Sequence, residues 1–270
     1  MKPQLFGILN ITEDSFSDGG RFLAPADALA HARAMIAGGA DALDIGAASS
    51  NPEANTVPVD IEIARLAAIV PALMKEGIAL SIDSFSPQVQ RWALEQGVAY
   101  INDIQGFPDP EIYPALAGSQ AKLIVMHSVQ ERGRATRVEV SPEEIVPRCL
   151  AFFEHRISAL TQAGIARERL ILDPGMGFFL GSNPDASLTM LRAIPQLKRA
   201  FGLPVLVSVS RKSFLRKITG REAKDSGPAT LAAELFAAGE GADHIRTHDP
   251  AALLDALRVL NALNARHCGA

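Results

Sequence analysis

Cysteine is scarce in this chain, which has only Cys149 and Cys268 among its 270 residues. The two lack the spacing of metal ligands, and a single pair in a chain of this size builds no disulfide framework. The scarcity therefore predicts a reducing compartment, the cytoplasm.

Long apolar runs and an excess of one charge are also missing. No stretch is long enough to span a bilayer, and Asn10 comes before any long apolar segment, so we expect neither a membrane-spanning segment nor a signal peptide. The formal net charge of −4 argues against coating nucleic acid or an anionic membrane surface, and neither is expected as a partner. Any anion that the protein binds must be held by a local basic cluster.

The pattern that is present is an alternation of short apolar runs with helical segments, about eight times along the chain. The strand-like runs are 5–9, 42–43, 78–82, 100–101, 123–126, 170–172, 205–209 and 245–247. The expected helices are 25–37, 61–75, 87–95, 110–117, 142–163, 186–199, 228–239 and 250–265, many with a proline near the start.

This alternation predicts an α/β fold with a parallel sheet closed into a (β/α)8 TIM barrel, built as one domain over residues 1–270. An open doubly wound sheet is the rival architecture. No GxGxxG follows the first strand to support that rival.

Each apolar run ends at a polar residue. These residues are Asn10, Asp44, Asp83, Asn102, His127, Asp173, Ser210 and His248. In a TIM barrel the carboxyl ends of the strands form the floor of the active site, so the pattern outlines a catalytic pocket.

Three of these ends carry acceptor groups suited to a flat heterocycle. Asp83, Asn102 and Asp173 follow the third, fourth and sixth runs, where barrel geometry brings their side chains together. A buried carboxylate needs N–H donors as partners. A single strand-end Asp is often structural, but three together favour a binding site.

The last two runs carry cations. Lys212, Arg246 and His248 lie around strands seven and eight, where phosphate sites of these barrels often form. Arg211 fits equally well as part of a solvated turn. The Asn10 carbonyl suits a magnesium ion that also holds substrate phosphates, although an isolated Asn more often caps a turn. The sequence leaves three roles open for His127: a base, a ligand or a core residue.

The segment after the sixth run joins two glycines to two aromatics. Gly175 and Gly177 would let the backbone approach a ligand closely, and Phe178 or Phe179 would stack on a ring. One of the two phenylalanines serves equally well as core packing.

Together these motifs identify a family. The chain resembles dihydropteroate synthase from about residue 5 to residue 250, in that family's order, through Gly7-Ile8-Leu9-Asn10, Asp44-Ile45-Gly46, Ile82-Asp83, Ile101-Asn102-Asp103-Ile104, Val125-Met126-His127, Leu172-Asp173-Pro174-Gly175, Ser210-Arg211-Lys212-Ser213 and Arg246-Thr247-His248. The resemblance implies a TIM-barrel transferase of folate biosynthesis. It would join (7,8-dihydropterin-6-yl)methyl diphosphate to 4-aminobenzoate, giving 7,8-dihydropteroate and diphosphate.

The resemblance also implies site residues. The pterin would be held by Asp83, Asn102, Met126, Asp173 and Lys212, and the diphosphate by Asn10, Ser50, Arg246 and His248. Asn10 would bind Mg²⁺, and Phe16, Pro52, Phe178, Phe179 and Ser210 would surround the aminobenzoate. Asp173, Lys212, Arg246 and His248 would be the catalytic residues.

Two loops depart from the family pattern. The second loop has Asn51 where the family usually has Arg, which puts phosphate binding by that loop in doubt. After strand six, the bulky Phe179 replaces a Gly. These changes resemble the mobile, sulfonamide-insensitive synthases, in which added bulk would exclude the drug while admitting the smaller aminobenzoate.

Other functions remain as alternatives. They are a drug-sensitive housekeeping synthase, a pterin-binding barrel of the corrinoid methyltransferase type, and a sugar-phosphate barrel. The basic cluster with Asn10 favours the synthase over the methyltransferase type, which handles no diphosphate. An apolar face on residues 253–263 would serve a homodimer or pack against the barrel.

Overall fold

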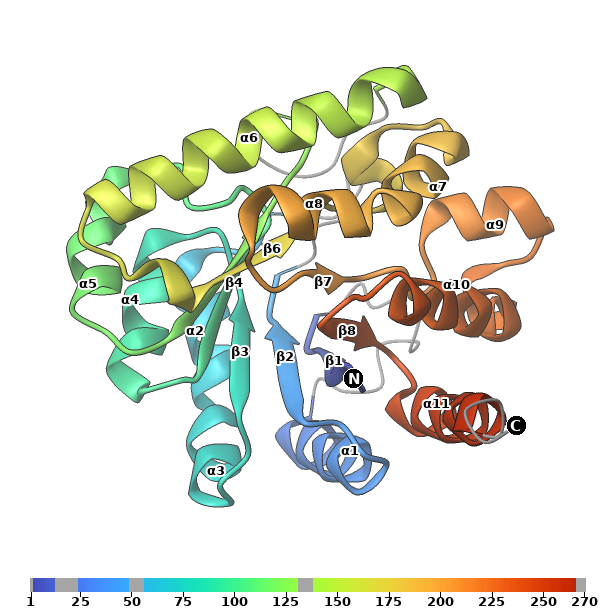
Figure 1. Ribbon diagram of the computed structural model, residues 1–270. Helices are drawn as coiled ribbons and strands as arrows, with labels where there is room; N and C mark the ends of the chain where they lie inside the picture. The colour runs from blue at the N-terminus through green and yellow to red at the C-terminus, as the bar shows by residue number, and fades with distance from the viewer. Residues whose placement is uncertain (1, 13–23, 49–55, 131–137, 266–270) are drawn as a thin grey trace.

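The computed structural model describes residues 2–12, 24–48, 56–130 and 138–265. Within them, eight parallel strands stand in the order β6-β5-β4-β3-β2-β1-β8-β7 (Figure 1). A parallel bridge between Leu172 and Val205 joins the two end strands, and the Leu172 N–H donates to the Pro204 carbonyl at 2.9 Å. The ring is therefore nearly closed, which confirms the predicted TIM barrel.

The strands are short and match the predicted runs closely. They are β1 (Gln4–Asn10), β2 (Ala42–Gly46), β3 (Leu80–Asp83), β4 (Tyr100–Asp103), β5 (Lys122–Met126), β6 (Leu170–Asp173), β7 (Leu206–Val207) and β8 (His244–Thr247). The helices lie outside the strands (Figure 1).

The helices are α1 (Pro25–Ala37), α2 (Val59–Ala67), α3 (Val70–Lys75), α4 (Pro87–Gln96), α5 (Tyr113–Ala117), α6 (Pro142–Gln162), α7 (Pro184–Arg192), α8 (Ile194–Phe201), α9 (Ser213–Thr219), α10 (Gly227–Gly239) and α11 (Pro250–Ala265). Short 3-10 turns are η1 (Pro110–Ile112), η2 (Arg167–Arg169), η3 (Gly177–Leu180) and η4 (Ala223–Asp225).

Prolines account for the main differences from the predicted helices. The segments predicted as 61–75 and 186–199 are each split into two helices, α2 with α3 and α7 with α8. Pro71 and Pro195 lie in the first turns of α3 and α8. A proline lacks the N–H that would continue the preceding helix, so each chain segment restarts there. Helix α9 was not predicted.

Alternate residues of each strand point into the barrel, so successive inward side chains lie at different depths, from the amino-terminal end to the carboxyl-terminal end of the strands. On β8, for example, His244 and Arg246 point inward, and on β4 Tyr100 and Asn102 do so. The amino-terminal residues of these pairs join a packed floor, whose buried apolar members are Phe6, Ala42, Tyr100, Ile124, Ile171 and Leu206. The next inward residues lie towards the opposite end, and most of them are polar: Asp44, Asn102, Asp173 and Ser208, with Ile8 and Met126 as the apolar members.

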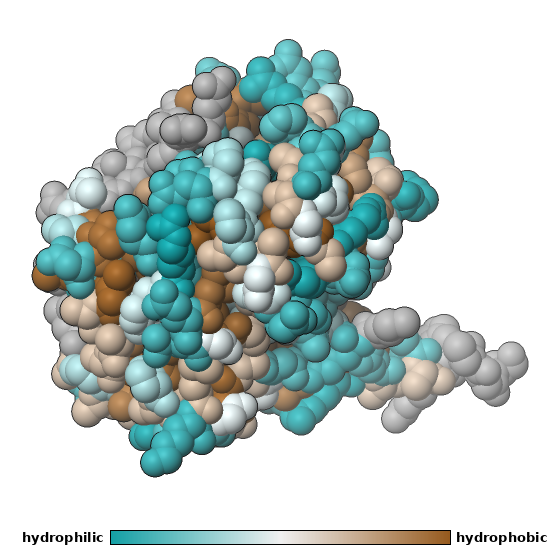
Figure 2. All heavy atoms as spheres, turned by 90° about the vertical axis from the view of Figure 1, so that its left-hand side faces the viewer, coloured by the Kyte–Doolittle hydropathy of each residue, from teal (hydrophilic) through white to brown (hydrophobic). Residues whose placement is uncertain are grey.

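The outer surface mixes residue types. Figure 2 shows hydrophilic residues spread among apolar ones over the face that it presents. In the described part of the chain, none of the helices has the length and apolar character needed to cross a membrane.

Candidate active site

The carboxyl ends of the strands line an open pocket. Its lining residues are Asp83, Asn102, Ile104, Met126, Asp173, Met176, Phe179, Ser208, Lys212 and Arg246. The structure thus brings together the residues that the resemblance assigned to the pterin, and it adds Arg246 and Phe179 to them. Ile104, Met176 and Ser208 were not anticipated.

An ion-pair network crosses this pocket from β8 to β2 and β3. The Arg246 guanidinium pairs with Asp44 through Nε and with Asp83 Oδ2 through Nη2 at 2.8 Å. The Asn102 amide donates to Asp44 Oδ2 at 3.2 Å. Asp44 is fully buried and joins Arg246 to Asn102, while Asp83 is joined through Arg246.

Asp44 is the site residue whose role sequence reasoning left open. Arg246 lies within a strand, and a buried cation there requires an anionic partner on a neighbouring inward position. Asp44 is an inward residue in the middle of β2, directly opposite Ser81 and Ile8. An arginine within a strand therefore indicates that a buried acidic partner exists. Only the closed barrel shows that this partner is Asp44.

Burial shifts the protonation of the charged groups in the pocket. Burial raises the pKa of Asp83 to about 7, with Arg246 opposing this shift and Asp44 adding to it. Burial likewise raises the pKa of Asp173 to about 6, against the hydrogen bond from the Gly175 N–H at 2.8 Å. Burial lowers the pKa of Lys212 to about 8, and the nearby Arg246 adds to the effect.

Several acceptor atoms of the site have no partner. Asn102 Oδ1, Asp44 Oδ1 and Ser208 Oγ are buried and make no hydrogen bond with the described residues. Such atoms are costly to bury unless something pairs with them. A flat ligand with several N–H donors along one edge would satisfy Asn102 and Ser208, which both line the pocket.

A second group of residues lies at the ends of β7 and β8. His248 Nδ1 is 2.9 Å from Ser210 Oγ, and the His248 backbone N–H also donates to this hydroxyl at 3.3 Å. Burial lowers the pKa of His248 well below its ordinary range, and Arg211 and Arg246 add to the shift. His248 is therefore a neutral hydrogen-bonding group at neutral pH.

Asn10 lies at the end of β1, opposite Gly46 at the end of β2. A Cβ at Gly46 would lie 3.4 Å from Asn10 Oδ1 and 3.9 Å from Asp83 Oδ2, so this glycine keeps the region between the two side chains clear. No cluster of three or more His, Cys, Asp or Glu side chains suited to a metal occurs among the described residues. Magnesium usually takes only one or two protein oxygens alongside substrate phosphates, so the Asn10 oxygen fits it.

The predicted aminobenzoate residues fall into two groups. Phe179 is buried in η3, and Lys212 Nζ lies 4.9 Å from the centre of its ring. Phe178 is more exposed, and its carbonyl accepts a hydrogen bond from Gln130 at 3.2 Å. The expected residues Phe16, Ser50 and Pro52, together with Asn51, lie outside the described residues.

His127 is a core residue. Its Nδ1 is 3.1 Å from the Pro174 carbonyl, its ring meets Phe152 edge-on at 5.2 Å, and burial lowers its pKa to about 4. The neutral ring donates to that carbonyl, which satisfies the buried nitrogen. This burial explains the polar end of β5 without a role in binding.

The glycines after β6 allow close packing of the chain around the strand end. Gly175 has φ +74°, and a Cβ there would lie 2.3 Å from the His127 carbonyl oxygen. Gly177 has φ +66°, with Ser213 Oγ 3.0 Å from its ideal Cβ. Gly175 thus allows close approach of the backbone at His127, and Gly177 that of the Ser213 and Lys212 side chains, while approach of a ligand to these glycines stays a prediction.

Comparison with known proteins agrees with this geometry. Residues 6–248 match the family described as "Pterin binding enzyme". The chain is 59% identical over 259 residues to dihydropteroate synthase type-2 of Escherichia coli, covering 96% of this chain and 95% of that protein. It is 54% identical to dihydropteroate synthase type-3 of Escherichia coli, covering 96% and 99%.

Solved structures give the same result. A dihydropteroate synthase from Xanthomonas albilineans with 4-aminobenzoic acid superposes with a TM-score of 0.87 at 37% identity, covering 98% of this chain and 94% of that one. One from Burkholderia cenocepacia, complexed with 7,8-dihydropteroate, superposes with a TM-score of 0.86 at 36% identity, covering 100% and 94%. The chain therefore belongs to the dihydropteroate synthase family.

Proposed function

We propose that the protein condenses (7,8-dihydropterin-6-yl)methyl diphosphate with 4-aminobenzoate to give 7,8-dihydropteroate and diphosphate. The observation that carries the proposal is the row of unpartnered acceptors, Asn102 Oδ1 and Ser208 Oγ, beside Asp83 in the strand-end pocket. A pterin edge supplies N–H donors for all three. Asp173 and Met126 complete the walls of this pocket.

The charges are arranged for departure of an anion. In the proposed course the bond between the pterin methylene carbon and the diphosphate oxygen breaks, and its electron pair leaves with the diphosphate. Arg246, Lys212 and His248 stabilise that developing charge, and Asp173 stabilises the cation left on the pterin. The aniline nitrogen of aminobenzoate then forms the new C–N bond and loses a proton to solvent.

We propose that Asn10 holds a magnesium ion together with the diphosphate oxygens. When bound, the ion supplies further neutralisation of the leaving group. Arg246 and His248 approach the diphosphate from the neighbouring strand end. Removing divalent ions with a chelator should abolish turnover, and Asn10→Ala should raise the magnesium concentration needed to restore it. An unchanged magnesium requirement in Asn10→Ala would contradict this assignment.

Diphosphate release tests the reaction. We expect release only when both the pterin diphosphate and 4-aminobenzoate are present, with 7,8-dihydropteroate formed in equal amount. Asp173→Asn should lose most of this activity, and Glu95→Gln, an exposed site on α4, should keep it. Pterin binding without turnover would instead favour a barrel of the corrinoid methyltransferase type.

We further propose that Phe179 makes the enzyme insensitive to sulfonamides. Its ring packs with Ile104 and Met126 in the wall of the pocket and lies beside Lys212. Bulk at this position would exclude the group that a sulfonamide carries beyond the outline of aminobenzoate.

Inhibition constants of Phe179→Gly and Phe178→Gly test this assignment. We expect the sulfonamide inhibition constant of Phe179→Gly to fall by a factor of about ten or more, where each factor of ten is ~1.4 kcal/mol of binding free energy. Its KM for aminobenzoate should change less. Phe236→Gly, an exposed site on α10, is the control for loss of a phenylalanine. If Phe179→Gly is as insensitive as the parent, the assignment is wrong, and a change confined to Phe178→Gly moves it to that residue.

We also propose a homodimer and a cytoplasmic location. On α11, Leu253 and Leu257 are buried in the barrel, but Val259 and Leu263 are 61% and 60% exposed on the outer face. Val259→Glu with Leu263→Glu should yield a monomer in sedimentation experiments, and an unchanged dimer would exclude this face.

Cys149 is buried as a free thiol, which suits a reducing cytoplasm.

A further inference from the structure

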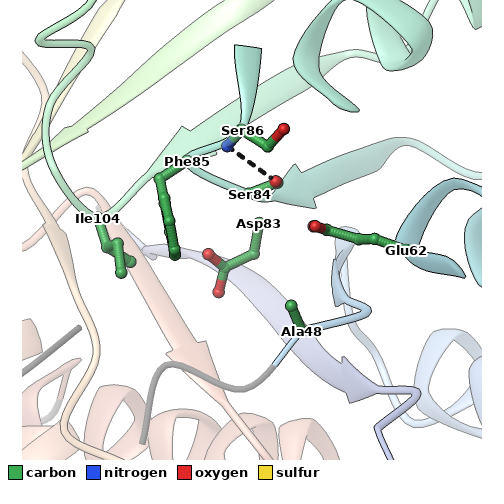
Figure 3. A pocket seen from close by; sticks show the side chains of 7 residues that line it. All are labelled: Ala48, Glu62, Asp83, Ser84, Phe85, Ser86 and Ile104. Atoms are coloured by element: carbon green, nitrogen blue, oxygen red, sulfur yellow. Dashed lines mark hydrogen bonds between the residues drawn. The ribbon is translucent and has the colours of Figure 1, made fainter. Parts of the chain in front are cut away.

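The turn after β4 carries Ile104 into the wall of the proposed pterin pocket. Ile104 is 5% exposed and lines that pocket together with Asp83 and Asn102. It also lines a second, adjoining pocket, where Figure 3 shows the Asp83 carboxylate directed towards Ile104. A flat ring held by that carboxylate would lie against the Ile104 side chain, so the position of Ile104 limits how closely the ring fits.

Hydrogen bonds define the geometry of this turn. The Gly106 N–H donates to the Asp103 carbonyl at 2.9 Å, which makes Ile104 and Gln105 the central residues of a β-turn. The Gln105 N–H donates to Asp103 Oδ1 at 2.7 Å. The chain then continues through Gly106 and Phe107, whose φ values are +68° and +60°. Glycine adopts this conformation freely, but a phenylalanine keeps it only where the surroundings hold it there.

Arg156, on α6, holds the left-handed part of the turn. It is 7% exposed, its Nε donates to the Gly106 carbonyl at 2.8 Å, and its Nη2 donates to the Phe107 carbonyl. Nη2 also donates to the Tyr113 hydroxyl at 2.6 Å, and that hydroxyl donates to the Phe107 carbonyl at 3.0 Å. The planar guanidinium therefore binds two consecutive carbonyls at once, in a fixed geometry.

Neighbouring side chains hold the turn from two other directions. Phe152 lies one helical turn before Arg156 on α6, and a Cβ at Gly106 would lie 2.6 Å from Phe152 Cζ. At the start of the turn, Gln90 Nε2 on α4 donates to Asp103 Oδ2 at 2.9 Å, and Gln90 is 1% exposed. Buried groups from two helices thus hold the two ends of the segment that presents Ile104 to the pocket.

We propose that Arg156 is a positioning residue for the pterin ring, acting on Ile104 through the two carbonyls that it binds. The inference rests on the proposed function, in which the pterin diphosphate occupies this pocket, and Arg156 touches no substrate. Without its hydrogen bonds the left-handed backbone at Phe107 would relax, and Ile104 would shift in the pocket wall. The pterin would then bind more weakly. The groups proposed to hold the diphosphate lie on other strands and would stay in place.

Calorimetric binding of the pterin diphosphate, without aminobenzoate, tests this role in Arg156→Met, which removes the donors but keeps an unbranched side chain. We expect the dissociation constant to rise about tenfold. With both substrates saturating, kcat should stay within about twofold of the parent value, because the groups that stabilise the leaving diphosphate are unchanged. Arg148, exposed on the same helix and paired with Glu144 at 3.4 Å, supplies the matched control, and Arg148→Met should bind as the parent does.

Two milder variants grade the contact and answer the question if Arg156→Met does not fold. Tyr113→Phe removes only the hydroxyl between Arg156 and Phe107, so we expect the dissociation constant to rise about twofold to fourfold. Arg156→Lys keeps the charge and one donor group, so its affinity should lie between those of Arg156→Met and the parent. Thermal unfolding of each variant shows how far stability changes.

A double-variant cycle with Ile104 tests the route. Ile104→Ala shortens the side chain whose placement Arg156 controls, and we expect it to weaken binding of the pterin diphosphate to a similar extent. Because both substitutions act at one contact with the ring, Arg156→Met combined with Ile104→Ala should be little weaker than either single variant. Additive losses would overturn the route through Ile104.

Failure of this inference is distinguishable from failure of the proposed function. If Asp83→Asn binds the pterin diphosphate as tightly as the parent, the proposed site itself fails. If Asp83→Asn loses binding but the folded Arg156 and Tyr113 variants bind as the parent does, with only their unfolding temperatures lowered, Arg156 is structural and the inference is overturned.

Discussion

The two ends of the barrel interior are built from the same strands but treat polar groups in opposite ways. At the floor, Phe6 meets Tyr100 edge-on with ring centres 5.0 Å apart, and the layer is packed and mainly apolar, with His244 as a polar member. At the mouth, Arg246, Asp44 and Asp83 form a buried ionic network beside unpartnered acceptors. The floor stabilises the barrel. The mouth is less favourable for folding, because it keeps buried polar groups unpaired to form a surface complementary to a ligand.

The largest expected effect is loss of the central cation at the mouth. Arg246→Met would leave the Asp44 carboxylate buried without its partner, and we expect the free energy of unfolding to fall by about 3–5 kcal/mol, with turnover lost. Denaturant unfolding measures the stability. Arg246→Lys keeps the positive charge but loses the planar guanidinium that contacts both carboxylates, so its free energy of unfolding should lie between those of the parent and Arg246→Met. A fully stable Arg246→Met protein would show that the network contributes no stability.

A large effect of a different kind is expected at the floor. Phe6 is fully buried, so Phe6→Ala should lower the free energy of unfolding by about 3–5 kcal/mol through lost contacts and a cavity. At a temperature where the variant is folded, its kcat/KM should match the parent. A reduced kcat/KM in folded protein would mean that the floor also shapes the mouth, and the division between the two ends would fail.

The pH dependence of Asp83 sharpens the contrast between stability and function. Its pKa is about 7 in the folded protein against an ordinary value of 3.8, so between these values only the folded state holds the proton. Stability from this group is present at low pH and is lost as the pH rises to about 7. Pterin binding, which needs the ionised carboxylate, should change in the opposite direction.

Unfolding free energies of the parent and of Asp83→Asn, compared from pH 4 to pH 8, measure that contribution. We expect the parent to lose stability relative to the variant as the pH rises across this window. A constant difference between the two proteins would show that Asp83 titrates in its ordinary range.

The smallest effect is expected at the one histidine of the floor. His244 contacts Phe6 at 5.5 Å between ring centres, and its Nδ1 has no partner among the described residues. Its pKa is lowered by burial to about 4 from 6.5, so its contribution to stability is lost as the pH falls from 6.5 towards 4. His244→Leu should change stability by less than about 1 kcal/mol at pH 7.5 and remove that acid sensitivity.

Unfolding of His244→Leu at pH 7.5 and pH 5 checks this, with activity at pH 7.5 as the functional control. A loss of activity would place His244 in contact with the site at the mouth, against its position beside Phe6.

Much of this site could be predicted because barrel topology is periodic. Once the runs were assigned to strands, Asp83, Asn102, Asp173 and Lys212 had to meet at one end, and the structure brings them together. The partners of those groups could not be predicted. His127 and Asp44 end similar runs, yet one bonds the Pro174 carbonyl in the core and the other anchors Arg246.

The sequence by itself determined the barrel and its polar end, since strand period, helix starts and strand-end residue types are local properties of the chain, and its motifs resembled those of the family. The tertiary structure decided which polar groups pair and which stay open. Arg246 and Asp44 are far apart in the sequence, and Arg156 reaches the turn after β4 from a helix. Pairing depends on distances in the closed barrel, and no local pattern records those distances.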